Sequence, residues 1–279
     1  MRTIHASEIN ELIYQLCIKA NCSLPADIKQ SLDNALIHST GRQKDVLNIL
    51  IENIELAEQT RVPVCQDTGI VVVFLEIGQN VMVVDGYIEE AINDGVRRAY
   101  QDAYLRKSVV SDPVIRKNTG DNTPAMIHTR IVEGDSLRLI VMPKGCGGEN
   151  MSSLWMLKPT DSISEIISTI VMHIKQVGAF SCPPLIIGVG IGGSFEVAPL
   201  LAKKALLRLI GESHPMHHIA EIEHKLLEKI NKLRIGPAGL GGTPTALTVN
   251  IETCATHIAS LPVAVSLCCY ANRHSEGVL

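Results

Sequence analysis

The chain has 279 residues, 46% of them hydrophobic, which is enough for one large core or two modest ones. Its formal net charge is -4, its basic residues do not cluster and only 3% of it is aromatic, so the sequence argues against nucleic-acid binding. No apolar run approaches the roughly 18 residues that span a bilayer, and the first residues lack the apolar core of a signal peptide. We therefore expect a cytoplasmic protein with no membrane partner.

The first 60 residues are predicted to be helical. Apolar side chains recur at steps of three and four residues behind Ser7, a possible helix cap, and again after Pro25. The residues that form these faces are Ile9, Leu12, Ile13, Leu16, Cys17, Ala20, Ile28, Leu32, Ala35, Leu36, Val46, Ile49, Leu50 and Ile54. We expect a helical N-terminal region over residues 1–60.

Residues 61–279 show a different pattern, in which short apolar runs are punctuated by glycine. The runs at 69–78, 80–86, 136–145, 183–193 and 260–269 are typical of strands. Helical patterns lie between some of them, at 87–106, 161–178, 195–210 and 217–233. The sequence thus predicts an α/β (mixed α+β) fold, with a mixed-sheet body flanked by helices that forms one continuous unit over 61–279.

Eight cysteines are spread along the chain, too sparse for a disulfide scaffold, and none forms a CxxC pair. Their use is therefore core packing, metal binding or nucleophilic chemistry. The chain ends soon after "VSLCCYANRHSEGVL", a polar segment with adjacent cysteines. We expect an active site near this end that another polypeptide helps to complete.

The stretch "VPVCQDTGIVVVFLEIG" places polar, reactive groups at the entrance of the most apolar segment. Cys65, Gln66, Asp67 and Thr68 offer a thiol, an amide, a carboxylate and a hydroxyl where a loop meets a strand. A buried charge there would need a partner or a metal. A turn with an incidental cysteine is the alternative interpretation.

Two other places along the chain favour a cysteine ligand. Cys182 precedes two prolines, which hold the backbone extended and stiff. Cys268 and Cys269 follow an apolar strand, and because adjacent strand residues face opposite sides, we expect one to be a ligand and the other to pack. Three thiolates from separate loops suit an iron–sulfur cluster with one iron left open to act as a Lewis acid.

Two glycine-rich stretches have alternative interpretations. "KGCGGEN" is either a loop whose backbone approaches an anion or a tight turn after a strand, and Cys146 within it ranks below Cys65, Cys182 and Cys269 as a ligand. "GVGIGG" matches a dinucleotide-binding pattern, although Glu212, at the right spacing for the acidic partner, has no strand before it. A nicotinamide-dinucleotide enzyme and a protein with a purely structural cluster or zinc ion are therefore the competing hypotheses.

Histidines occur in two settings. His214, His217 and His218 form a cluster in a polar stretch, which is more typical of solvated side chains than of a metal site. His257 lies just before a strand, where it either packs as a structural histidine or bonds a carboxylate and carries a proton.

With these residues in view, the sequence resembles the α subunit of the two-subunit class I fumarase and L-tartrate dehydratase family of iron–sulfur hydro-lyases. The motifs that carry the resemblance span nearly the whole chain: "PVCQDTG", "NTGDNTPA", "KGCGGEN", "SCPP", "GVGIGGS" and "HIASLPVAVSLCC".

The resemblance implies a site and a cofactor. It implies that a [4Fe–4S] cluster is held by the cysteines of three motifs and that its fourth iron binds substrate. It also implies that Gln66 and Asp67 line the site, that Arg106 grips a substrate carboxylate, that Gly147 offers its backbone, and that His257 pairs with the aspartate. The implied ligands are Cys65, Cys182 and Cys269, while Cys146 occupies a position that is glycine in single-chain relatives.

The resemblance further implies the reaction and the partner. We expect reversible hydration of fumarate to L-malate, with conversion of L(+)-tartrate to oxaloacetate as the alternative. In single-chain relatives, further substrate-binding and catalytic residues come from a C-terminal domain, so the proton-abstracting base is expected elsewhere. We therefore expect a separate β subunit, in an α2β2 complex.

Overall fold

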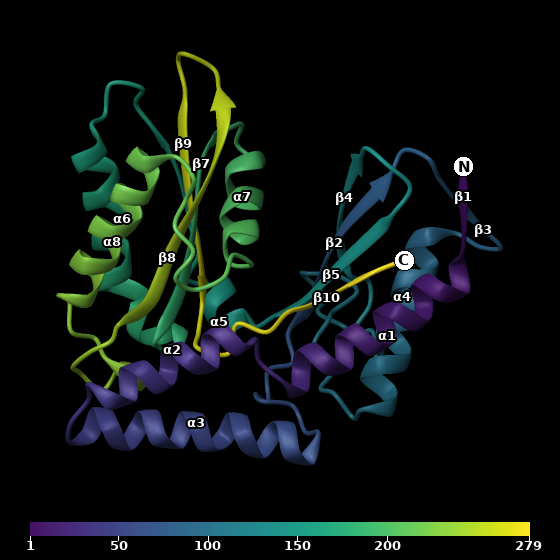
Figure 1. Ribbon diagram of the computed structural model, residues 1–279, viewed down its shortest axis with the longest axis horizontal. Helices are drawn as coiled ribbons and strands as arrows, with labels where there is room; N and C mark the ends of the chain where they lie inside the picture. The colour runs from purple at the N-terminus through teal and green to yellow at the C-terminus, as the bar shows by residue number, and fades with distance from the viewer. The chain divides into compact units, whose positions relative to one another are not determined.

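The computed structural model describes residues 1–279. The chain divides into two compact units, each of which is built from segments that are distant in sequence (Figure 1). Unit 1 comprises Met1–Pro25, Asn53–Cys146 and Arg273–Leu279, and unit 2 comprises Ala26–Glu52 and Gly147–Asn272. The predicted mixed α/β fold is confirmed, while a division into regions 1–60 and 61–279 stays a prediction.

The N-terminal region is helical, as predicted. It forms α1 (Ala6–Cys22), α2 (Ala26–Ile37) and α3 (Arg42–Thr60). Ser7 is not the cap, because α1 already begins at Ala6 and the His5 N–H donates to the Glu8 carboxylate at 2.8 Å. The helix therefore starts with a Glu8 capping interaction rather than with a serine hydroxyl.

Unit 1 is built on a four-stranded sheet in the order β10-β5-β2-β4. Strand β2 runs parallel to β4 and antiparallel to β5, so a central apolar strand is covered on both sides by hydrogen-bonded neighbours. A separate parallel pair joins β1 to β3. The strands of this unit are β1 (Arg2–His5), β2 (Ile70–Gly78), β3 (Val81–Val84), β4 (Met126–Val132), β5 (Leu137–Lys144) and β10 (Ser275–Val278).

The core of unit 1 lies between this sheet and a helix pair. Helix α1 packs against α4 (Ile88–Asp102) and against β5. Buried aliphatic residues of α1 meet alternate residues of β2, including Val71, Val73 and Leu75. Alternate residues of β2 thus share the side that contributes to this core.

Unit 2 has a second four-stranded sheet, in the order β6-β9-β7-β8. Its strands are β6 (Ser153–Leu157), β7 (Leu185–Gly193), β8 (Ala246–Thr256) and β9 (Leu261–Cys268). Strand β7 is parallel to β8 and antiparallel to β9. Short helical turns lie at α5 (Cys146–Glu149), which starts at the last residue of unit 1, at η1 (Gly178–Ser181) and at η2 (Pro237–Gly239).

Helices cover both faces of this second sheet (Figure 1). On one face, α6 (Ile163–Val177) and α8 (His217–Asn231) bury isoleucines and leucines against β7, β8 and β9. On the other face, α7 (Val197–Ala205) lies against β7 and β9. Unit 2 is therefore a three-layer arrangement of helix, sheet and helix.

The close approach of α7 to β7 depends on two glycines within the strand. A Cβ atom at Gly188 would lie 2.0 Å from the Ala202 carbonyl oxygen, and one at Gly190 would lie 2.0 Å from the Ala198 carbonyl oxygen. No side chain fits at either position without moving the helix. Glycine at these sites, with alanine on the helix, lets the two backbones touch.

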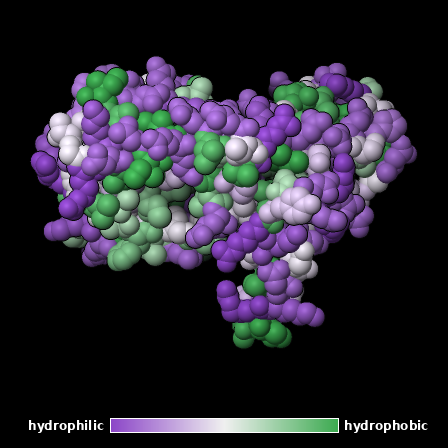
Figure 2. Space-filling model, turned by 90° about the horizontal axis from the view of Figure 1, so that it is seen from below, coloured by the Kyte–Doolittle hydropathy of each residue, from purple (hydrophilic) through white to green (hydrophobic).

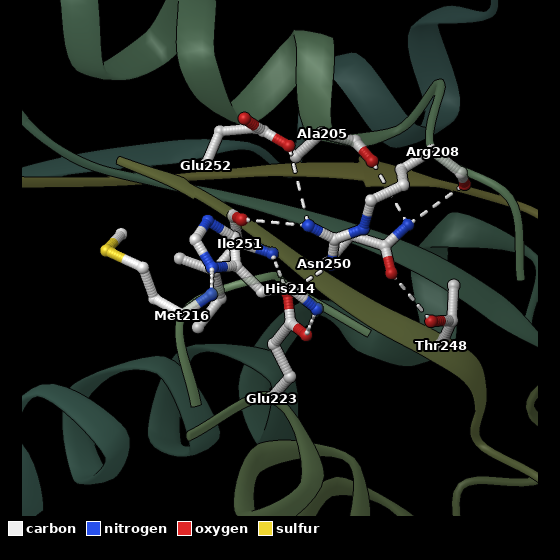
Figure 3. Close-up of polar contacts among 9 residues, drawn as sticks. All are labelled: Ala205, Arg208, His214, Met216, Glu223, Thr248, Asn250, Ile251 and Glu252. Carbon is white, nitrogen blue, oxygen red and sulfur yellow. Dashed lines mark hydrogen bonds and ion pairs between the residues drawn. The ribbon is translucent and has the colours of Figure 1, made fainter. Parts of the chain in front are cut away.

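A buried ion pair between Arg208, which follows α7, and Glu223 of α8 lies beside the edge strand β8 (Figure 3). The Arg208 guanidinium donates to the Glu223 carboxylate, to the Ile251 carbonyl at 3.1 Å and to Glu252 at 3.4 Å. Glu223 also accepts the N–H groups of Ile251, at 2.7 Å, and His214, at 3.1 Å. The carboxylate therefore has a partner for each oxygen, which is what makes a buried charge tolerable.

The same network gives two neighbouring polar residues a structural role. The Asn250 side chain donates to the carbonyls of Ala205 and Arg208, each at 3.1 Å, and accepts from Thr248 at 2.9 Å (Figure 3). His214 Nδ1 accepts the Met216 N–H at 3.0 Å. His214 thus helps to shape the turn before α8.

The surface seen in Figure 2 is mostly hydrophilic, and hydrophobic side chains gather on it only in smaller areas. Such a distribution is ordinary for a globular chain, whose surface keeps many apolar atoms. None of the helices combines the length and the apolarity that crossing a membrane requires.

Candidate active site

The loop that precedes β2 is held at its start by side chains and backbone of two helices. The Val64 N–H donates to the Asn21 carbonyl at the end of α1, and the Val64 carbonyl accepts from the Asn53 side chain of α3, both at 2.9 Å. Asn21 is fully buried. Both backbone polar groups of Val64, the residue before Cys65, therefore have a hydrogen-bond partner.

The end of this loop is fixed in the same way. The buried Tyr100 hydroxyl donates to the Thr68 carbonyl at 2.6 Å, and the fully buried Asn122 side chain donates to the Gly69 carbonyl at 3.1 Å. Gly69 has φ +72°, and a Cβ there would lie 2.6 Å from the backbone of Lys144. The chain consequently needs glycine where the loop enters the strand.

Between these anchors, three side chains remain accessible. Gln66 is exposed, and Cys65 and Asp67 are half-buried. The Asp67 carboxylate accepts the Gly69 N–H at 3.0 Å through Oδ1 and the Cys146 N–H at 2.8 Å through Oδ2. Two backbone donors thus orient a carboxylate beside an accessible thiol and an accessible amide.

Arg106 belongs to the same part of unit 1. Its carbonyl accepts the Thr68 hydroxyl at 2.6 Å, and its side chain is exposed. The backbone just after Arg106 is held by Asn122, whose Oδ1 accepts the Ser108 N–H at 2.7 Å. The backbone of Arg106 is therefore anchored to the Cys65 loop while its guanidinium stays available for an anion.

The prediction that the prolines hold the backbone extended at Cys182, in unit 2, is wrong. Cys182 follows η1 and has φ 53° and ψ 64°, the left-handed region, and its side chain is exposed. A residue with a β-carbon adopts this conformation at a cost of order 1–3 kcal/mol, and such residues concentrate at functional sites. The Pro183 carbonyl next to it accepts the Ala238 N–H at 2.7 Å, which fixes the following turn.

The adjacent cysteines at the end of β9 differ in exposure, as expected. Cys268 is the last residue of the strand and is 6% exposed, whereas Cys269, just beyond it, is half-buried. Cys268 therefore packs, and Cys269 is the accessible thiol of the pair. Its role as a ligand stays a prediction.

His257 and Gly147 are both exposed in unit 2. His257 lies in the turn between β8 and β9, where its Nδ1 accepts the Ala259 N–H at 3.1 Å and its carbonyl accepts the Ser260 N–H at 2.9 Å. Gly147 lies in α5, and the nearest atom to a Cβ built there is the Phe180 carbonyl oxygen at 4.0 Å. The histidine ring is thus oriented by its own turn, and Gly147 has open space beside it.

The buried cysteines of α1 contrast with these accessible thiols. Burial raises the pKa of the Cys17 thiol, and it raises that of Cys22 against an opposing effect of Arg61. Because the thiolate is the form that binds metal, neither is suited to be a ligand. The soft sulfur donors of Cys65, Cys182 and Cys269 have the accessibility and the chemistry that an iron–sulfur cluster requires.

Comparison with known proteins identifies the family. A family model described as "Fumarate hydratase (Fumerase)" matches residues 10–278. The chain belongs to the fumarate hydratase family. It is accordingly a hydro-lyase.

Relatives of this family member cover almost the whole chain. A Methanocaldococcus jannaschii protein provisionally named L(+)-tartrate dehydratase subunit alpha is 44% identical over 276 residues, which is 96% of each chain. L(+)-tartrate dehydratase subunit alpha proteins from Escherichia coli K12 and Shigella sonnei are each 30% identical over 271 residues, 96% of this chain and 89% of theirs.

Within this hydro-lyase, the predicted site residues divide between the units. Unit 1 brings together the side chains of Cys65, Gln66 and Asp67 with the backbone of Arg106, and unit 2 contains the others. No group of three or more His, Cys, Asp or Glu side chains is arranged to hold a metal ion. The catalytic, substrate-binding and ligand roles stay predictions.

The glycine pattern "GVGIGG" has a packing explanation in this hydro-lyase. Gly188 and Gly190 lie inside β7, where α7 crosses them, and not in the turn that opens a helix. A dinucleotide-binding turn places its first glycines after the strand, facing the pyrophosphate. The packing of α7 thus accounts for these glycines without a nucleotide.

Sequence reasoning missed the residues that hold the Cys65 loop. They place polar groups against the main chain of the loop: the carbonyl of Asn21 and the side chains of Asn53, Tyr100, Asn122 and Arg273. A polar residue within an otherwise apolar helix face, as at Asn21, is a signal that could have found one of them.

Proposed function

We propose that this chain is the α subunit of a hydro-lyase that holds a [4Fe–4S] cluster through Cys65, Cys182 and Cys269 and interconverts fumarate and L-malate. The single observation that carries the proposal is the fixed loop before β2. It presents a thiol, an amide and a doubly hydrogen-bonded carboxylate within consecutive residues of a chain from the fumarate hydratase family.

The cluster is supported by the donor set. A cluster bound by three thiolates keeps one iron without a protein ligand, and that iron would supply a Lewis acid for a departing hydroxyl oxygen.

Substrate carboxylates would be bound by groups that are accessible in each unit. The exposed Arg106 guanidinium is a bidentate partner for one carboxylate of a dicarboxylic acid. The exposed Gln66 amide and the Gly147 backbone would bind the remaining polar groups of the substrate. Gly147 directly follows Cys146, whose N–H binds Asp67, so covalent connectivity keeps it near the carboxylate.

Proton transfer would involve His257 and Asp67. Histidine is the side chain that changes charge most readily near neutral pH, and the turn around His257 already orients its ring. In our proposal the Asp67 carboxylate, oriented by two amides, is its hydrogen-bonding partner during the reaction. The base that removes the carbon-bound proton is assigned to the partner subunit.

The partner is proposed to be a β subunit, in an α2β2 complex. The relatives in E. coli and Shigella are named as alpha subunits of L(+)-tartrate dehydratase. Those names also favour a second candidate reaction, the dehydration of L(+)-tartrate to oxaloacetate. L-malate and L(+)-tartrate differ by one hydroxyl group, and in our proposal contacts from the β subunit choose between them.

An anaerobic assay of the reconstituted complex tests the proposal. We expect turnover of fumarate or L(+)-tartrate by the chain with its β subunit, and none by the chain alone. Full turnover by the lone chain would refute the divided site, and no turnover of either acid by the cluster-loaded complex would refute the function.

The ligand set has its own test. Cys65→Ser should lower cluster iron and sulfide without unfolding the chain, because Cys65 is half-buried in a loop held by other residues. Cys254→Ser is the matched control, since Cys254 is an exposed thiol outside the proposed set. Unchanged iron in Cys65→Ser would remove this cysteine from the ligands.

A further inference from the structure

We propose that Arg273 is a positioning residue of the hydro-lyase site, a buried cation that sets where Gln66 and Asp67 point. The inference rests on the proposed function, and it assigns a role to a residue that touches neither the substrate nor the reacting atoms. It is carried by the contacts of Arg273 with the Cys65 loop.

Arg273 contacts both the Cys65 loop and helix α1, which holds the start of that loop. Its Nη2 donates to the Asp67 carbonyl at 2.6 Å, and its Nη1 lies 3.4 Å from the Asn21 side-chain oxygen. The Asn21 carbonyl in turn accepts the N–H of Val64. One guanidinium therefore links the residue two places after Cys65 to the helix that holds the residue before it.

The burial of Arg273 is unusual for an arginine and calls for a reason. The residue is 3% exposed, and its Nε has no hydrogen-bond partner. Burying a charged group with an unsatisfied donor is unfavourable, so its burial needs a compensating contact, and the bond to the Asp67 carbonyl is one. A neutral side chain of similar volume would avoid that cost but would lose the bond to the Asp67 carbonyl.

The positive charge also lies near the carboxylate that it positions. Asp67 Oδ2 is 3.1 Å and Arg273 Nη2 is 3.6 Å from the point where a Cβ of Gly145 would sit. Both groups therefore lie around one small space that glycine leaves open. Opposite charges at this separation attract each other, and Oδ2 of the same carboxylate accepts the Cys146 N–H.

Without Arg273, the loop would keep its bonds at Val64, Thr68 and Gly69 but would lose the tie at Asp67. A shift of about 1 Å in catalytic groups reduces turnover by about 100-fold. Substrate binding through Arg106 would be less affected, because its backbone is anchored separately by Thr68. The expected signature is a fall in kcat with a smaller change in KM.

The test uses the reconstituted, cluster-loaded complex with Arg273→Met and Arg273→Lys. We expect kcat to fall by about 10- to 100-fold in Arg273→Met. Arg273→Lys should recover part of the lost kcat, because its ammonium can bond the Asp67 carbonyl but cannot also reach the Asn21 side chain. Arg208→Lys is the matched control: it alters another buried arginine, in unit 2, and should leave kcat unchanged.

A second readout does not depend on activity. Hydrogen exchange of the Gly69 and Cys146 amides, which bind the Asp67 carboxylate, should accelerate in both Arg273 variants and not in Arg208→Lys. Unchanged exchange and unchanged kcat in Arg273→Met would overturn the proposal, as would an equal loss of kcat in Arg208→Lys. If the wild-type complex acts on neither acid, the proposed function fails and exchange alone decides the positioning role.

Discussion

Removing the Glu223 carboxylate should destabilise unit 2 more than any surface substitution. Glu223→Ala leaves the Arg208 guanidinium, whose side chain is 12% exposed, without its closest counter-charge, and leaves the Ile251 N–H without its acceptor. Breaking one partner of a buried ion pair typically costs about 3–5 kcal/mol. Glu252, at 3.4 Å from the same guanidinium, remains as a weaker partner. The expected loss of unfolding free energy is therefore at the lower end of this range, about 3 kcal/mol.

Trp155 makes the measurement specific to unit 2. It is the single tryptophan of the chain and lies in β6, so its fluorescence follows unfolding of that unit even if the units unfold separately. A loss of about 3 kcal/mol corresponds to a fall in Tm of about 6–12 °C for a domain of this size. Urea titration should show a lower midpoint with an unchanged slope.

Glu228→Ala is the matched control on the same helix. Its carboxylate pairs with Lys232 at the surface, where the pair is screened by solvent, so the midpoint should not move. Glu223→Gln keeps an acceptor for the amides but removes the charge, so its urea midpoint should lie between those of Glu223→Ala and Glu228→Ala. Equal midpoints for Glu223→Ala and Glu228→Ala would refute the reasoning.

Two further predictions concern a packing glycine and a surface-loop carboxylate. Gly188→Ala should unfold unit 2 or strongly lower the urea midpoint followed by Trp155, because the new Cβ would lie 2.0 Å from the Ala202 carbonyl oxygen. Gly147→Ala is the control: the nearest atom to its Cβ would be 4.0 Å away, so the midpoint should not change. The same variant should raise the KM of the cluster-loaded complex, because Gly147 is proposed to bind substrate. Partial burial favours a higher pKa for Asp121, but bonds from Thr123, Arg97 and Thr119 outweigh it and lower the pKa from 3.8 to about 2. The ionised Asp121 therefore stabilises the fold above about pH 4, and this effect is lost as the pH falls toward 2. The difference in unfolding free energy between wild type and Asp121→Asn, measured by circular dichroism, should shrink between about pH 4 and pH 2.

Each of these predictions has a clear contrary result. A Gly188→Ala variant with the wild-type midpoint would show that α7 can move away from β7. A stability difference for Asp121→Asn that stays constant down to pH 2 would show that the carboxylate does not carry the effect.

Buried apolar strands were predictable from the sequence, whereas polar edge strands were not. The runs at 69–78, 136–145 and 183–193 became β2, β5 and β7, because continuous burial requires continuous apolar residues. Strands β4 and β8 lie at sheet edges and alternate apolar residues with Thr, Arg, Asn and Glu. Their backbone is satisfied on one side by a neighbouring strand and on the other by solvent or side chains, which the apolar pattern does not record.

The candidate site was predictable where its chemistry sits in consecutive residues. Cys65, Gln66 and Asp67 share one loop, so the sequence alone singled them out. Arg273 was not predictable, because its contact with Asp67 joins residues 206 positions apart. Hydrogen bonds of that kind depend on the tertiary fold and leave no local signal.

The polar side chains around β8 have a consequence for association between molecules. An edge strand offers unpaired N–H and C=O groups that can pair with a strand of another chain. Here Glu223 and Arg208 occupy the N–H and C=O of Ile251, and Asn231 of α8 occupies those of Ala246. Side chains thus take the place of a further strand, which protects this edge against β-sheet aggregation.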